Sequence, residues 1–112
     1  MRTQTQISVR YVEEVAIFDI IGYLTEDSEE GMDRAYEQAK DSAKILLSFD
    51  QQSFITSSGF GLIVKLIWQM RNKGQTLRVV HPSDQVRKIF DVIGLAQSIA
   101  VLASEKEALA DF

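Results

Sequence analysis

Two serines stand directly before a long apolar run, in the stretch "TSSGFGLIVKLIW" from Thr56 to Trp68. An N-cap side chain accepts a hydrogen bond from a backbone N–H two or three residues further on, and the pattern predicts this role for Ser57 or Ser58. A second interpretation is covalent, because a phosphate at a helix start is held by free N–H groups and the helix dipole. Small neighbours, Gly59 and Gly61, would leave such a hydroxyl accessible. Both serines are therefore candidate phosphate acceptors.

A catalytic serine is a third interpretation, and the residues around it argue against it. A nucleophilic serine needs an adjacent general base. The only histidine, His81, precedes Pro82 in another predicted loop, where Asp84 is the only carboxylate close in sequence. The stretch "TSSGFG" also lacks the G-x-S-x-G turn that exposes a nucleophile. We expect a protein that is not an enzyme, with His81 as a loop residue.

Composition excludes several other functions. The 112 residues include no cysteine, which removes thiol catalysis and cysteine-bound metal centres. A formal charge of −4 and the lack of a basic stripe argue against nucleic-acid binding. The longest apolar stretch is interrupted by Lys65 and Gln69, so we expect no signal peptide, no membrane insertion and a cytoplasmic location. The whole of residues 1–112 is predicted to form one globular domain without cofactor or metal.

The pattern of apolar residues predicts an α/β domain in the order β-β-α-β-α-β-α-β-α. Two strands around an acidic turn predict an N-terminal antiparallel hairpin, and the short apolar run at 43–49, which shows no polar alternation, predicts a strand central in a parallel sheet. Gly74, Ser83, Gly94 and the pair Ser104 and Glu107 supply helix start and stop signals. The predicted strands are Gln6–Val12, Val15–Leu24, Ala43–Phe49, Thr76–Val80 and Ser98–Leu102, with helices over Thr25–Ser42, from Phe60 to near Gly74, from Ser83 to Gly94 and after Ser104.

The helix that begins near Phe60 has too wide an apolar face for one contact. At 100° per residue its large apolar side chains span about 200°, roughly twice what a helix lying on a sheet needs. Either the helix is covered on two sides, for which the C-terminal helix is a candidate, or one flank meets a partner. Val64 and Trp68 form one edge of the face, and Leu62 and Leu66 form the other. We favour a partner-facing flank.

With these elements in place, the chain resembles the STAS domain family, the fold of bacterial anti-sigma factor antagonists, over roughly Gln6 to Leu109. The resemblance rests on the order and spacing of "GYL", "SFITSSGFGLI", "RNKG", "LRVVHPSDQVRKIFDVIGL" and "SEKEAL". It implies a mixed, largely parallel sheet of four to five strands with an N-terminal antiparallel hairpin and about four helices.

In antagonists of this family, the serine immediately before the glycine is phosphorylated by a GHKL-type serine kinase that is also the anti-sigma factor, and a PP2C-type phosphatase removes the phosphate. By position the resemblance implies Ser58 as the acceptor, with Ser57 as second choice. The kinase would supply ATP and magnesium, and a homodimer is also compatible with the resemblance. The implied partner surface consists of Thr25, Thr56, Ser57, Ser58, Gly59, Phe60, Val64 and Trp68.

Three positions depart from the family pattern, because antagonists typically carry aspartates where this chain has Thr25, Ser48 and Thr56. Their loss eases the repulsion that a phosphate feels but removes ion-pair partners for a kinase's lysine or arginine. The alternative is therefore a non-enzymatic STAS scaffold subunit, either of a stressosome-like complex or of an ABC lipid-transport complex.

Overall fold

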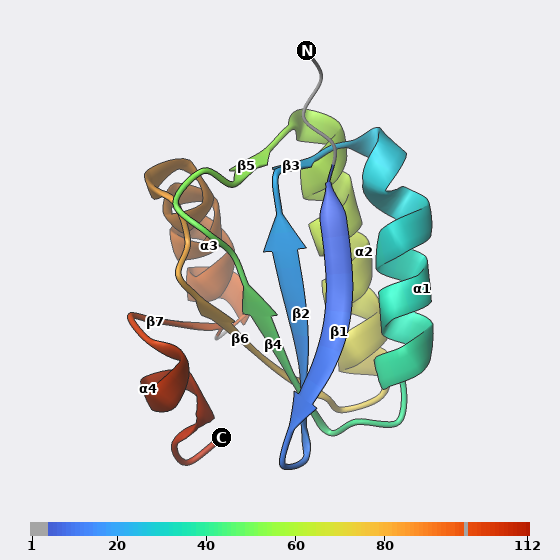
Figure 1. The fold of residues 1–112 in the computed structure, drawn as a ribbon, viewed down its shortest axis with the longest axis vertical. Coiled ribbons are helices and arrows are strands. Elements are labelled where there is room, and N and C mark those ends of the chain that lie inside the picture. Colours follow the sequence, from blue (N-terminus) through green and yellow to red (C-terminus); the bar gives the residue numbers. More distant parts are fainter. Residues whose placement is uncertain (1–4, 98) are drawn as a thin grey trace.

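The structure is a computed structural model that describes residues 5–97 and 99–112. Its centre is a five-stranded sheet in the order β1-β2-β4-β6-β7 (Figure 1). β1 and β2 are antiparallel, and all the other neighbours are parallel. The predicted largely parallel sheet with an N-terminal hairpin is thus confirmed. The strands are β1 Gln6–Val12, β2 Val15–Ile21, β4 Lys44–Ser48, β6 Thr76–Val80 and β7 Ala100–Leu102.

A second, two-stranded sheet was not predicted from the sequence. The strand predicted over Val15–Leu24 stops at Gly22, whose φ of 95° turns the chain out of β2. β3 (Tyr23–Leu24) then pairs in parallel with β5 (Phe54–Ile55). Each strand has two residues, too few to show a hydrophobic period. This small sheet lies at the end of the molecule where α2 begins (Figure 1).

Three long helices share one core on one face of the main sheet (Figure 1). They are α1 Glu29–Ala39, α2 Ser57–Asn72 and α3 Asp84–Gln97. A short 3-10 turn, η1 Glu26–Ser28, precedes α1, so the helix predicted from Thr25 begins as two pieces. The core joins sheet residues such as Phe18 and Leu47 to Ile63 of α2 and Phe90 of α3. α1 and α2 lie side by side.

The last helix, α4 Glu105–Leu109, packs against β6 and β7 and covers the opposite face of the sheet. It therefore does not cover the second flank of α2, which corrects one option left by the sequence. Arg78 of β6 fixes the chain end, because its guanidinium donates to the carbonyls of Ala108 and Ala110 at 3.0 and 2.8 Å and lies 4.5 Å from the centre of the Phe112 ring.

Local capping signals are confirmed at three helix ends. Gly74 (φ 69°) follows α2, and Gln75 N–H donates back to Met70 O at 2.9 Å, as expected of a left-handed helix stop. Ser83 Oγ accepts from Val86 N–H at 3.2 Å at the start of α3. Ser104 Oγ accepts from Glu107 N–H at 3.2 Å at the start of α4.

Two predicted boundaries were wrong or lie outside the described residues. Gly94 does not end α3, which continues to Gln97, because glycine permits a left-handed stop without requiring one. The strand predicted over Ser98–Leu102 is β7, Ala100–Leu102, and Ser98 lies outside the described residues.

Candidate functional site

The start of α2 is capped by Thr56 and not by either serine, so the prediction that Ser57 or Ser58 is the N-cap was wrong. Thr56 Oγ1 accepts from Gly59 N–H at 3.1 Å, and the Thr56 backbone is extended (φ −77°, ψ 172°). Its N–H and its hydroxyl both donate to Leu24 O, at 3.0 and 3.2 Å. Because this bonding continues the β3–β5 pairing by one residue, the helix begins directly after Thr56.

Ser57 and Ser58 are consequently the first two helical residues, and both are exposed. Within residues 5–97 and 99–112 neither hydroxyl makes a hydrogen bond, to a histidine, a carboxylate or any other group. The 100° step between neighbours in a helix points them to different sides, Ser57 towards Phe60 and Ser58 towards Lys65. The first turn of α2 therefore exposes two hydroxyl groups that form no hydrogen bond within the described residues.

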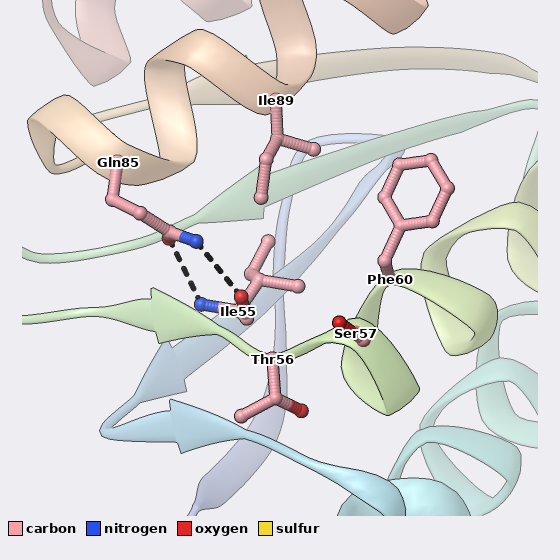
Figure 2. Close-up of a pocket in the computed structure, with 6 residues that line it drawn as sticks. All are labelled: Ile55, Thr56, Ser57, Phe60, Gln85 and Ile89. Atoms are coloured by element: carbon pink, nitrogen blue, oxygen red, sulfur yellow. Dashed lines mark hydrogen bonds between the residues drawn. The ribbon is translucent and has the colours of Figure 1, made fainter.

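Ser57 lines an open hollow of about 310 Å³ between the start of α2 and α3 (Figure 2). Ser58 is not among the residues that line it. The lining residues are Ile55, Thr56, Ser57, Phe60, Gln85 and Ile89.

The side chain of Gln85 completes the edge of the small sheet. Its Oε1 accepts from Ile55 N–H at 3.0 Å, and its Nε2 donates to Ile55 O at 2.8 Å (Figure 2). The amide therefore pairs with β5 as a neighbouring strand would, and it ties α3 to the segment that leads into Thr56. The sequence does not predict this role for Gln85, because only the approach of α3 to β5 brings the amide to the strand.

Gly59 is required by the crossing of α2 over β3. A Cβ atom added there would lie 2.0 Å from Leu24 O and 2.6 Å from Leu24 C, both of them backbone atoms. At Gly61, two residues on, an added Cβ would meet nothing within 4 Å. The first of these glycines therefore serves to seat the helix start on the small sheet.

The wide apolar face of α2 is only partly used inside the domain. Leu62 and Leu66 are buried, so that edge faces the core. The opposite edge is open, because Trp68 is 61% exposed, Phe60 is 39% exposed and Val64 is half-buried. At 1.5 Å per residue this flank extends about 16 Å from the first turn to Trp68.

The polar edge of α2 forms ion pairs with α1. Lys65 Nζ lies 3.0 Å from Asp33 Oδ1 and 3.4 Å from Glu29 Oε2. The hydrogen bond to Asp33 is the main cause that raises the pKa of Lys65. These contacts are exposed and contribute little stability, but they give partners to the cation that lies on the same side of α2 as Ser58, two helical turns further on.

The three hydroxyl residues expected around the site divide into two groups. Thr25 and Thr56 follow the paired residues Leu24 and Ile55 at the same end of the small sheet. Thr25 caps η1, since its Oγ1 accepts from Asp27 N–H at 3.2 Å. Ser48, by contrast, is buried in β4 and does not belong to the exposed surface.

The matching sequence model of the STAS domain family covers residues 6–108, so the chain belongs to this family. Several solved structures with a similar fold are of proteins described as anti-sigma factor antagonists. SpoIIAA in its unphosphorylated form has a TM-score of 0.71, with 21% identity over 93% of each chain. The Bacillus cell fate determinant SpoIIAA in its phosphorylated form has a TM-score of 0.67, with 24% identity over 95% of this chain and 96% of that chain. An antagonist from Mycobacterium paratuberculosis has a TM-score of 0.75, with 14% identity over 95% and 92%.

At these identities the likeness shows a shared fold. In the part of the chain that the structure describes, no helix is both long enough and apolar enough to cross a membrane.

Proposed function

We propose that this chain is a regulatory protein-binding domain of the anti-sigma factor antagonist type. It binds an anti-sigma factor that is also a GHKL-type serine kinase, and this binding releases the sigma factor. The observation that carries the proposal is the first turn of α2, where two exposed hydroxyls, neither of them hydrogen-bonded within the described residues, adjoin the open flank of Phe60, Val64 and Trp68.

Phosphate on Ser58 is the proposed off-switch. The modification adds up to about two negative charges, and the N-terminal end of a helix accommodates them. Thr25 and Thr56 place neutral hydroxyls near this turn, so the phosphate meets less repulsion than carboxylates would cause. An anion at the edge of an apolar docking surface has to be desolvated when the partner binds, which weakens binding without unfolding the domain.

The arrangement supports Ser58 over Ser57 as the acceptor. Ser57 faces the hollow beside Phe60 and Gln85, whereas Ser58 points to the Lys65 side of the helix, away from α3.

The acceptor is tested by incubating the chain with its kinase and ATP and mapping the modified residue by mass spectrometry. We expect the label on Ser58, its loss in Ser58→Ala, its retention in Ser57→Ala, and its removal by a PP2C-type phosphatase. Ser58→Asp is expected to weaken kinase binding at least tenfold in a titration. A chain that takes no label on either serine, or a Ser58→Asp variant that binds like wild type, contradicts the switch.

The docking flank has its own test with a matched control. Trp68→Ala is expected to weaken kinase binding by about tenfold or more, because a large aromatic side chain at an interface is often a dominant contact. Val92→Ala, on α3, removes an even more exposed apolar side chain from outside the flank, since Val92 is 72% exposed and Trp68 61%. If both variants bind alike, the flank is not the docking surface.

The second candidate is a non-enzymatic scaffold subunit of a stressosome-like complex or an ABC lipid-transport complex. It is favoured by Thr25 and Thr56, which cap η1 and α2 without supplying carboxylates for a kinase's cations. Reconstitution separates the two candidates, because a GHKL kinase would bind under the first and an ABC ATPase or another STAS protein under the second.

A further inference from the structure

The β1 edge of the main sheet is long, and within residues 5–97 and 99–112 no strand covers it. β1 is the terminal strand of the sheet and has seven residues, whereas the other terminal strand, β7, has three (Figure 1). Proteins usually protect such an edge with charged side chains, most often lysine, or with proline or a bulge. The sequence "QISVRYV" has no lysine or proline, its one charged residue, Arg10, is held by Asp19 and Glu105 of the same chain, and its register with β2 runs without a bulge from Gln6 to Val12.

The hairpin turn determines which backbone groups of β1 point outward. Only Glu13 and Glu14 separate Val12 from its partner Val15, and in a hairpin with a two-residue loop the pair next to the loop is hydrogen-bonded. Hydrogen-bonded and non-hydrogen-bonded pairs then alternate along the strands. The N–H and C=O groups of Gln6, Ser8, Arg10 and Val12 therefore face β2. Those of the three intervening residues, Ile7, Val9 and Tyr11, face away from the sheet.

We propose that β1 pairs antiparallel with β1 of a second copy of this chain, about a two-fold axis at Val9. In this register Val9 lies opposite Val9 of the second copy, and Ile7 lies opposite Tyr11 of the second copy. All three outward-facing residues then have hydrogen-bonded partners. A shift of the axis to Ile7 or Tyr11 would leave some of these groups unpaired. The contact is closed and self-complementary, as a two-fold interface requires.

The side chains fit the same register on the helix-covered face. Ile7 and Val9 are half-buried and pack against the core under α1. Tyr11 is 51% exposed, and its hydroxyl donates to Gln38 O of α1 at 3.0 Å, which holds the ring at the edge. Each Tyr11 would cover Ile7 of the second copy, a favourable aromatic–aliphatic pair between strands.

Charge is compatible on the opposite face. The register places Ser8 opposite Arg10 of the second copy, so the two arginines are not directly opposed. Each Arg10 is also neutralised within its own chain, by Asp19 at 2.6 Å and by Glu105. The interface uses no residue of α2 and does not depend on the proposed function, so each copy would keep its α2 surface free.

The test is the association of the purified chain in sedimentation equilibrium over a concentration series, with a charge pair at Ser8. Ser8→Arg puts a like charge opposite Arg10 of the second copy twice in each dimer, and Ser8→Glu puts an opposite charge there twice. The dimer Kd is expected to rise roughly 2- to 30-fold for arginine and to fall by a similar factor for glutamate.

Folding of the single chain should respond with the opposite sign, which separates the two effects. Ser8 is opposite Asp19 on β2, so arginine should stabilise the monomer and glutamate destabilise it in urea unfolding. Val9→Pro removes the central outward N–H and leaves the bonds to β2 in place, so it should abolish the dimer. A wild-type chain that stays monomeric at the highest soluble concentration overturns the proposal. So does a dimer whose Kd does not move in opposite directions with the two Ser8 variants.

Discussion

Replacing Gly59 by alanine should destabilise the domain at the start of α2 far more than the addition of one methyl group suggests. The added methyl would lie 2.0 Å from Leu24 O, whereas ordinary contacts of a Cβ atom begin at 3.4 Å. The atom it meets belongs to the backbone of β3, so no side chain can rotate away. The helix start and β3 must therefore move apart.

The cost of this separation follows from the bonds that cross the junction. Leu24 O accepts from the N–H and from the hydroxyl of Thr56, at 3.0 and 3.2 Å. Each such hydrogen bond contributes about 1 kcal/mol, and forcing a group into a packed site costs about 1–3 kcal/mol. Alanine regains about 1 kcal/mol in helix propensity. The net loss should be about 2–4 kcal/mol, a large share of the roughly 5–15 kcal/mol typical of a domain.

Urea unfolding followed by circular dichroism measures this loss directly, and Gly61→Ala is the matched control. Gly61 lies in the same helix with nothing within 4 Å of an added Cβ, so alanine there should stabilise the domain by about 0.5–1 kcal/mol. The two substitutions are chemically identical and two residues apart, yet they should shift the urea midpoint in opposite directions. A Gly59→Ala variant as stable as wild type would refute the reasoning about the α2–β3 contact.

Two further substitutions test the cap and the link between β1 and α4. Thr56→Ala removes the N-cap of α2 and one bond to Leu24 O, so the free energy of unfolding should fall by about 1–2 kcal/mol, while Ser58→Ala should stay within about 0.5 kcal/mol. Glu105→Gln weakens the pair with Arg10, a partly exposed contact worth about 0.5–1 kcal/mol after solvent screening.

The same pair makes the Glu105 effect depend on pH. The hydrogen bond from Arg10 is the main cause that lowers the pKa of Glu105 in the folded chain below its ordinary 4.5. A lowered folded-state pKa means that the stabilisation is complete above about pH 4.5 and disappears as the pH falls through the lower folded value. Thermal melts of wild type and Glu105→Gln should therefore converge in acid. If the difference in melting temperature between wild type and Glu105→Gln stayed constant down to about pH 2, the assignment of the Arg10–Glu105 pair would be contradicted. For the cap, equal stabilities of Thr56→Ala and Ser58→Ala would contradict the assignment of Thr56 as the N-cap of α2.

Local patterns in the sequence predict much of the fold. The hairpin follows from two strands around Glu13 and Glu14, and β4 follows from an apolar run with no polar alternation. Gly74 and Ser83 ended and began helices as predicted, because these signals act through the bonds of one turn. The serine-glycine start of α2 and its overly wide apolar face could likewise be found without coordinates.

The sequence could not choose among Thr56, Ser57 and Ser58 as the cap, since all three hydroxyls can accept the same kind of bond. Only the pairing of Thr56 with Leu24, 32 residues earlier in the chain, makes Thr56 the N-cap of α2. Both serines are then left without a capping role. The side of α2 left open was also undecided, because it depends on which elements pack against the helix. Sequence alone thus determined the main helices and strands and the candidate serines through short-range bonding, but not the two-residue strands β3 and β5. Tertiary structure decided which hydroxyl groups form hydrogen bonds that stabilise the fold and which stay exposed, because that depends on contacts between distant segments.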